Sequence, residues 1–155
     1  MYKRILVPVD GSPTSDQALD AAIDLALSGG GHLRLVHALD EPLWLAAYGI
    51  HGRTGAGLYD AMRDSGHELL QACMEKAQSA GVETDMMLLD KPGVRLGEAV
   101  AQAAKRWNAD LVVLGSHGRR GFHRAVLGSG AEEVIRQAPV PVLVVRCRTG
   151  VPAAT

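Results

Sequence analysis

The sequence predicts a single doubly wound α/β domain with a five-stranded parallel sheet, because strand-like and helix-like segments alternate along its 155 residues. The strand-like runs at the two ends, within residues 4–9 and 140–145, are apolar without alternation. Such runs are typical of parallel strands that are buried on both faces. A hydrophobic content of 47% is enough to fill the core of one domain of this length.

The first strand and helix have clear boundary signals. Residues 4–9 form the predicted strand, and Asp10-Gly11 ends it. Ser12 can cap a helix whose first position is Pro13, since a side-chain oxygen there accepts from the free N–H groups of the first turn. The helix stops at the glycines of 29–31, and residues 32–39 form the second strand. The apolar face of this helix is expected to be Ala18, Ala22, Leu25 and Ala26.

The remaining elements follow the same alternation. We expect a helix over 58–80, a strand over 82–89, a helix over 95–107, a strand over 110–114, a helix over 131–136 and a strand over 140–145. The long helix has its apolar positions at Leu58, Met62, Leu69, Cys73 and Ala77. Four helices between five parallel strands predict the strand order 3-2-1-4-5. The winding direction then reverses between strands 1 and 4, where ligands bind in open α/β sheets.

The most informative motif follows the fourth strand. Gly115-Ser116-His117-Gly118 ends that strand, and nine residues later Gly128-Ser129 opens the next helix, with Ser129 at or near its N-cap. Backbone N–H groups in such turns and at a helix N-terminus form an anion-binding concavity. The motif therefore predicts a phosphate site, with a tight turn that holds no ligand as the alternative. Asp10 and Gly115 lie on the two strands that flank the switch point, so motif and topology indicate the same place.

The spacing of these glycines resembles the ATP-binding signature of the universal stress protein family. Residues 3–12 and 139–145 also resemble the first and last strands of that family. The resemblance covers 1–148 and leaves 149–155 as an expected flexible tail. It implies an ATP-binding protein that acts as a nucleotide-dependent regulatory switch in a stress response, with Mg²⁺ held through the phosphates. It also implies a homodimer.

The resemblance implies a role for particular residues. The backbone of 115–118 and of 128–130 would hold the phosphates, and the Ser129 hydroxyl would add a hydrogen bond. Asp10, with Pro8 and Val9 beside it, would border the adenosine, and the backbone of Ala38 would lie against adenine. Arg119, with Arg120 and Arg124, could screen phosphate charge, although a solvated surface is nearly as plausible an interpretation. The full set of expected nucleotide-binding residues is Pro8, Val9, Asp10, Ala38, Gly115, Ser116, His117, Gly118, Arg119, Gly128, Ser129 and Gly130.

Rival phosphate and catalytic motifs are missing from the sequence. It has no P-loop pattern, no three-glycine dinucleotide fingerprint after the first strand, and no nucleophile elbow. Asp10 can also serve the helix N-terminus, and the backbone of His117 is a sufficient reason for its position, so no catalytic or metal-ligating side chain is assigned. Binding is favoured over catalysis. The alternatives are a slow ATPase or phosphotransferase of the same fold, or a regulatory subunit of a transporter.

Composition and charge limit the partners and the cell compartment that we expect for the chain. A net charge of −1 gives no general attraction to nucleic acid or anionic membrane. Cys73 and Cys147 are too few for a disulfide framework and are expected to be ordinary buried or half-buried thiols, as in a reducing compartment. With neither a leader nor a membrane span in the sequence, we expect a cytoplasmic protein.

Two segments suggest interfaces. Residues 40–65 mix aromatic side chains with glycines and could be a lid, a partner surface for an unknown protein, or a crossover that packs on its own domain. Residues 140–145 form an apolar edge strand with prolines only at its start. Pairing with the same strand of a second copy, as the family commonly does, would cover it.

Overall fold

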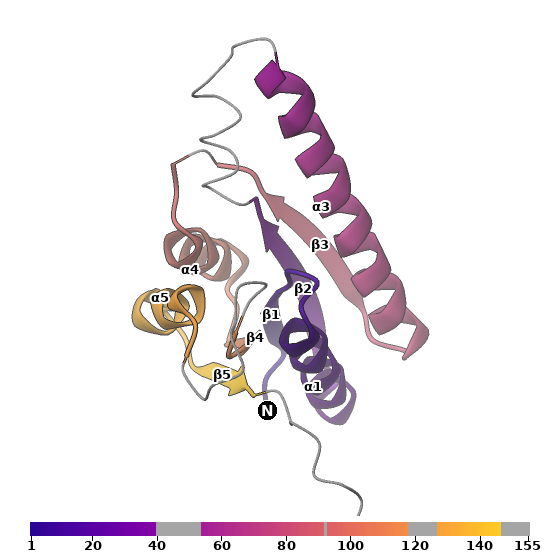
Figure 1. The fold of residues 1–155 in the computed structure, drawn as a ribbon. Coiled ribbons are helices and arrows are strands. Elements are labelled where there is room, and N and C mark those ends of the chain that lie inside the picture. The colour runs from indigo at the N-terminus through magenta and orange to yellow at the C-terminus, as the bar shows by residue number, and fades with distance from the viewer. Residues whose placement is uncertain (40–53, 92, 118–126, 147–155) are drawn as a thin grey trace, which may run out of the picture.

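The computed structural model describes residues 1–39, 54–91, 93–117 and 127–146, and these form one α/β sheet structure (Figure 1). The strands are β1 (Arg4–Pro8), β2 (His32–Ala38), β3 (Thr84–Leu89), β4 (Leu111–Gly115) and β5 (Val142–Val145). The helices are α1 (Pro13–Gly29), α3 (Thr54–Ser79), α4 (Leu96–Trp107) and α5 (Ser129–Gln137). Every described strand pair is parallel, and the order is β3-β2-β1-β4-β5. The predicted fold class and strand order are confirmed.

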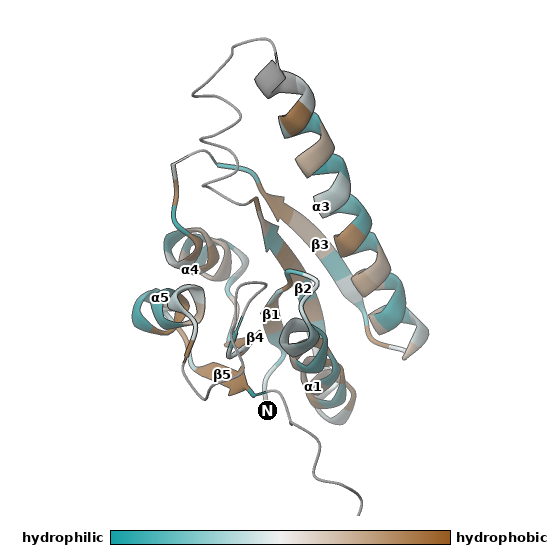
Figure 2. Cartoon of the chain, viewed as in Figure 1, coloured by the Kyte–Doolittle hydropathy of each residue, from teal (hydrophilic) through white to brown (hydrophobic). Residues whose placement is uncertain are grey.

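The helices cover the sheet in two layers. α1 and α3 pack on one face, where Ile5, Leu19, Leu35 and Leu70 are fully buried. α4 and α5 pack on the other face, over a second cluster that includes Leu6 and Val112. Figure 2 shows largely apolar strands flanked by helices in which hydrophobic and hydrophilic residues alternate. This burial of both faces accounts for the continuously apolar strands.

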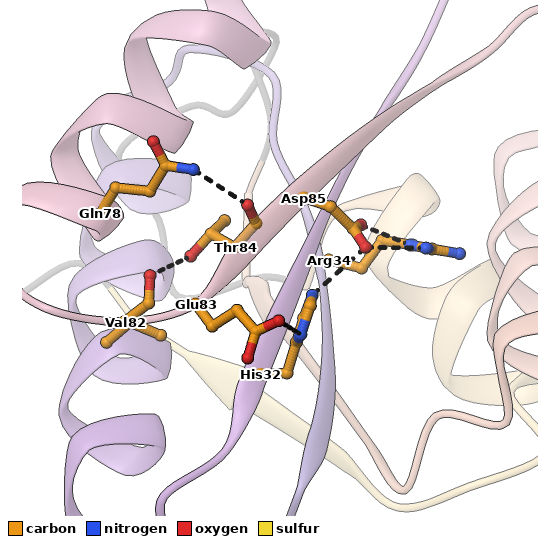
Figure 3. Close-up of polar contacts among 7 residues, drawn as sticks. All are labelled: His32, Arg34, Gln78, Val82, Glu83, Thr84 and Asp85. Carbon is orange, nitrogen blue, oxygen red and sulfur yellow. Dashed lines mark hydrogen bonds and ion pairs between the residues drawn. The ribbon is translucent and has the colours of Figure 1, made fainter.

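Charged side chains form hydrogen bonds and ion pairs at the amino-terminal end of the β2–β3 pair (Figure 3). The Arg34 guanidinium donates to both carboxylate oxygens of Asp85, with Nε at 2.5 Å and Nη2 at 2.8 Å. The guanidinium groups of Arg34 and Arg4 lie over the ring of Trp107, at 4.8 and 4.7 Å from its centroid. These cations shield the end of the second core cluster while their charged heads stay partly in water.

Some element boundaries differ from those predicted. The long helix begins at Thr54 instead of residue 58, since a glycine near a helix start lowers helix propensity by only about 1 kcal/mol relative to alanine. Leu58, expected on its apolar face, is 39% exposed. β3 begins at Thr84 instead of residue 82. β5 begins at Val142 instead of residue 140, since Pro141 has no N–H to donate to the ladder.

Candidate functional site

The carboxyl ends of three adjacent strands meet where the sequence predicts the site. β1 lies between β2 and β4 in the sheet (Figure 1). Asp10, which follows β1, therefore has the end of β2 at Ala38 on one side and the end of β4 at Gly115 on the other. β2 and β4 lie on opposite sides of β1, which makes this the predicted switch point of the sheet.

Asp10 shapes the turn that leads into α1. Its Oδ1 accepts from the N–H of Ser12 at 2.9 Å, and its own N–H donates to Ser15 Oγ at 3.1 Å. Gly11 between them has φ +78°, which glycine adopts without steric cost. Ser12 is the N-cap of α1, and its hydroxyl accepts from the N–H of Ser15 at 3.2 Å. The predicted cap is confirmed, and Asp10 supports it from the preceding turn.

The residues next to Asp10 at this end of the sheet differ in exposure. They are Pro8, Val9 and Ala38. Val9 is 3% exposed and belongs to the core beneath α1, with its N–H donating to the carbonyl of Val36 at 2.8 Å. Its carbonyl bonds His37 Nδ1 at 2.8 Å. Pro8 and Ala38 are half-buried. A ligand at this end of the sheet could therefore contact Asp10, Pro8 and the end of β2, but not the buried side chain of Val9.

Gly115 lets the end of β4 touch the first turn of α1. A Cβ on Gly115 would lie 2.8 Å from the carbonyl carbon of Thr14 and 3.0 Å from the backbone nitrogen of Ser15. The Thr14 hydroxyl, itself buried, donates to the carbonyl of His117. The sequence analysis did not name Thr14 as a residue near the site. Its position in the first helical turn, directly after Pro13, was the signal that could have indicated it.

The backbone of Ser116, directly after β4, bonds to both β5 and the start of α5. Its N–H donates to the carbonyl of Val145 at 2.8 Å, and its carbonyl accepts from the N–H of Gly128 at 2.8 Å. The first bond continues the β4–β5 ladder, and the second holds the start of α5 against the end of β4. The amides of Ser116 and Gly128 thus already have acceptors, and these two bonds hold β5 and the start of α5 against the end of β4.

His117 carries a buried polar atom with no partner in the part of the chain that the structure describes. Its Nδ1 lies 2.9 Å from Ser116 Oγ. Its Nε2 is buried, and no described residue lies within hydrogen-bond reach of it. Such a nitrogen is costly to bury and calls for a partner.

The first turn of α5 contains N–H groups that have no acceptor within the helix. Gly128 is its N-cap in extended conformation, with φ −66° and ψ 151°, and Ser129 and Gly130 are its first helical residues. N–H groups of a first helical turn have no intrahelical acceptor and carry the positive end of the helix dipole. A Cβ on Gly130 would lie 2.8 Å from Leu96 Cδ2, so this glycine also allows α5 to approach α4. The sequence placed Ser129 at or near the N-cap, and it is the first residue of the helix.

Some expected site residues lie outside the described residues. These are Gly118 and Arg119, together with the neighbouring Arg120 and Arg124. The tail at 149–155, Cys147 and residues 40–53 of the aromatic segment lie outside as well. The rest of that segment, from Thr54, belongs to α3.

In the part of the chain that the structure describes, no helix is long and apolar enough to cross a bilayer.

Several known proteins are similar to this chain. It is 34% identical over 150 residues to universal stress protein MJ0531 of Methanocaldococcus jannaschii, an alignment that covers 94% of this chain and 83% of that protein. Among solved structures, a universal stress protein family member from Burkholderia pseudomallei is 31% identical with a TM-score of 0.71, over 93% of this chain and 96% of that one. Hypothetical protein MJ0577 has the same fold, with a TM-score of 0.82 at 23% identity, over 97% of this chain and 99% of that one.

Two further structures of this fold contain a nucleotide. One is a universal stress protein in complex with cAMP, with a TM-score of 0.62 at 24% identity over 94% of this chain and 97% of that one. The other, from Archaeoglobus fulgidus, is in complex with dAMP, with a TM-score of 0.64 at 23% identity over 93% of this chain and 98% of that one. The model of the Usp family, the universal stress protein family, matches residues 1–146. The chain therefore belongs to the universal stress protein family.

Proposed function

We propose that this chain binds ATP between the ends of β1 and β4 and acts as a nucleotide-dependent regulatory switch. The main support is the buried Nε2 of His117, which has no hydrogen-bond partner among the described residues. The backbone around it bonds the first turn of α1 at Thr14 and the start of α5 at Gly128. A bound ligand at this edge would give that nitrogen a hydrogen-bond partner. The cAMP and dAMP complexes of two proteins with this fold favour an adenine nucleotide.

The phosphates would lie at the N-terminus of α5. The N–H groups of Ser129 and Gly130 would donate to phosphate oxygens, together with the Ser129 hydroxyl, because the dipole of α5 favours negative charge there. Ser116 and Gly128 would hold this helix end against β4 through the bond between them. Gly118 and Arg119 belong to the same proposal from the sequence. Mg²⁺, when bound, would neutralise phosphate charge, since it prefers phosphate oxygens to an all-protein site.

The adenosine would lie over β1 and the end of β2. Asp10 and Pro8 would border the ribose and base, with the backbone of Val9 and Ala38 forming the floor. The carboxylate of Asp10 accepts from Ser12, which holds it in place beside the end of β1. This arrangement puts base and phosphates on opposite sides of the switch point.

The test compares two substitutions at Ser129. Ser129→Ala removes the hydroxyl and keeps the backbone N–H, whereas Ser129→Pro removes both. Proline is favoured at the first position of a helix, and the extended Gly128 before it is compatible with proline, so α5 should persist in both variants. The affinity for MgATP is measured by titration calorimetry, with thermal unfolding as the control for folding.

We expect Ser129→Pro to bind MgATP more weakly than Ser129→Ala by roughly tenfold or more, since a hydrogen bond to a charged group contributes about 1.5–3 kcal/mol. Both variants should unfold at the wild-type temperature. If Ser129→Pro is folded and binds MgATP as tightly as Ser129→Ala, the N–H of Ser129 does not contact phosphate. If the wild-type chain binds no MgATP at all, the proposed function is wrong.

The switch requires that bound nucleotide changes the protein without being consumed. Hydrogen exchange with and without MgATP should show slower exchange in the first turns of α1 and α5 and in the end of β4. ADP formation over the same period should stay at the level of a Ser129→Pro control. ADP production that this variant loses would instead favour the slow ATPase or phosphotransferase. Binding without any change in exchange would remove the switch and leave a nucleotide-binding protein.

The proposal includes a cytoplasmic homodimer that pairs through β5. The carbonyls of Pro141 and Val145 accept from β4, so the alternating backbone groups of Val142 and Val144 face the free edge. The side chain of Leu143 is 39% exposed. Val144→Pro removes an outward N–H and should convert the dimer to a monomer in light scattering. An unchanged dimer would exclude this interface.

A further inference from the structure

β3 is the edge strand on the side of the sheet opposite β5. The directions of its backbone N–H and carbonyl groups follow from its pairing with β2. The N–H of Leu33 donates to the carbonyl of Glu83 at 2.9 Å, and Leu33 pairs with Thr84. Because the backbone groups of successive strand residues point to opposite sides, residues 83, 85, 87 and 89 face β2. The N–H and carbonyl groups of Thr84, Met86 and Leu88 therefore face away from the sheet.

The outward groups at the start of β3 are partly covered. Gln78 at the end of α3 donates its side-chain amide to the carbonyl of Thr84 at 3.2 Å (Figure 3). No described residue makes a comparable bond to the outward groups of Met86 or Leu88. Among the described residues, the uncovered part of the edge is thus the second half of β3.

This half of β3 lacks the features that protect edge strands. Residues 86–89 read Met-Met-Leu-Leu, without a charge or a proline, and Met87 is 37% exposed. Natural edge strands usually carry a charge, a proline or a bulge there. Methionine side chains are adaptable and are common on surfaces that bind peptides.

The helix beside this edge is acidic. A shallow groove of about 450 Å³ lies between α3 and β3, lined by His67, Glu68, Gln71, Ala72, Glu75 and Met86. The exposed carboxylates of α3 follow one side of the helix at Asp60, Asp64, Glu68 and Glu75. Arg63 pairs with Asp90 and Lys76 with Asp20, so the two cations of the described part of α3 bridge to other elements. The groove therefore presents negative charge.

We propose that β3 accepts an extended, basic segment of a partner protein as a sixth strand. Its backbone would bond the outward groups of Met86 and Leu88. Side chains alternate along a strand, so every second residue would face α3 and the others would lie beside Met87. Basic residues on the α3 side would approach Glu68 and Glu75, and apolar residues on the other side would cover Met87. The partner segment thus alternates lysine or arginine with apolar residues, the β-augmentation mode of recognition.

Charge argues against a second copy of this chain as the occupant. Pairing two β3 edges would bring two acidic α3 helices together, and like charges in an interface are unfavourable. The proposed site is also on the opposite edge from β5 in the strand order, so a dimer through β5 leaves it free.

The test uses a fluorescein-labelled octapeptide of alternating Lys and Val, and its Glu-Val counterpart as the control peptide. Binding to the intact chain is followed by fluorescence anisotropy at low and at physiological salt. Met86→Pro removes one outward N–H and leaves the bonds to β2 in place, which is where sheets tolerate proline. Val144→Pro is the matched control, since it makes the same change on the other edge. The double variant Glu68→Gln and Glu75→Gln changes charge alone on an exposed helix surface.

We expect the Lys-Val peptide to bind and the Glu-Val peptide not to bind. Met86→Pro and the double Gln variant should each weaken binding by roughly tenfold, and Val144→Pro should have no effect. Higher salt should weaken binding to the wild type but change little for the double Gln variant. The proposal is wrong if neither peptide binds, if both bind equally, or if a folded Met86→Pro variant binds as the wild type does. Self-association that Met86→Pro abolishes would also overturn it, in favour of a second copy.

Discussion

Gly115→Ala tests how closely β4 approaches α1 at the centre of the proposed site. The new Cβ would lie 2.8 Å from the carbonyl carbon of Thr14, 2.9 Å from its oxygen and 3.0 Å from the nitrogen of Ser15. All three are backbone atoms of the first turn of α1, and that turn is held by the Ser12 cap. No side chain can rotate away to relieve the contact, so β4 or α1 must move.

The size of the effect follows from this overlap. Overpacking of a well-packed site costs about 1–3 kcal/mol. Replacing glycine also restricts the unfolded chain, which returns about 0.4–1 kcal/mol. We therefore expect a net loss of about 1–2 kcal/mol in the free energy of unfolding, or a decrease of about 2–8 °C in Tm for a chain of this size.

The measurement is urea unfolding followed by circular dichroism, with the melting temperature as a second readout. Gly57→Ala is the matched control, since it makes the same chemical change in α3 where, apart from the adjoining backbone, no described atom lies within 4 Å of the new Cβ. That variant should gain up to about 1 kcal/mol. A Gly115→Ala chain as stable as Gly57→Ala would show that the two elements are not in tight contact. Weaker MgATP binding by Gly115→Ala is also expected, because Thr14 holds the carbonyl of His117.

Three further predictions concern other parts of the molecule. Ser12→Ala should lower the free energy of unfolding by about 0.5–2 kcal/mol in urea titrations, because the N–H of Ser15 loses its cap; an unchanged midpoint would contradict the cap. Burial raises the pKa of Asp85, but the hydrogen bonds and charge of Arg34, together with His32, outweigh burial and hold this pKa below its ordinary value. The carboxylate thus contributes stability above the unfolded-state pKa of about 3.9 and loses it as the pH falls through the lowered folded-state pKa. The stability difference between wild type and Asp85→Asn should shrink below about pH 4, and a difference independent of pH would refute this reading. Burial, and then the charge of Asp16, raise the pKa of the Cys73 thiol, with Lys76 opposing them. Iodoacetamide should therefore modify Cys73 slowly in the native chain and rapidly in urea, as read by mass spectrometry, and equal rates would show that the thiol is accessible.

Local signals in the sequence were sufficient for most of the fold. Ser12 and Pro13 mark the start of α1 and Gly30 its end, because a cap and a left-handed residue act within a few positions of the chain. The apolar runs identified the strands, and their alternation with helices led to the strand order. Boundaries were less accurate at Thr54, where nearby glycines did not delay the start of the helix, and at Val142, where the missing N–H of Pro141 sets the start of the strand.

For the proposed site, the sequence indicated a location but not the hydrogen bonds within it. The strand order places the ends of β1, β2 and β4, near Asp10, Ala38 and Gly115, at the same end of the sheet. The sequence analysis assigned phosphate contacts to the amides around Ser116 and Gly128, yet these two amides donate to backbone carbonyls.

The sequence by itself determined the family, the element types and the parallel sheet, since each of these depends on periodicity or on a motif of neighbouring residues, and it pointed to the carboxyl ends of β1 and β4 as the proposed ligand site. Only the tertiary structure decided which backbone amides there donate to other backbone groups, why Gly115 must lack a side chain, and which half of β3 no described residue covers. Gly115 and Thr14 are far apart in the chain, and Gln78 reaches Thr84 around a turn. Contacts of this kind depend on how the strands and helices pack together in space, and spacing along the chain does not encode those distances directly.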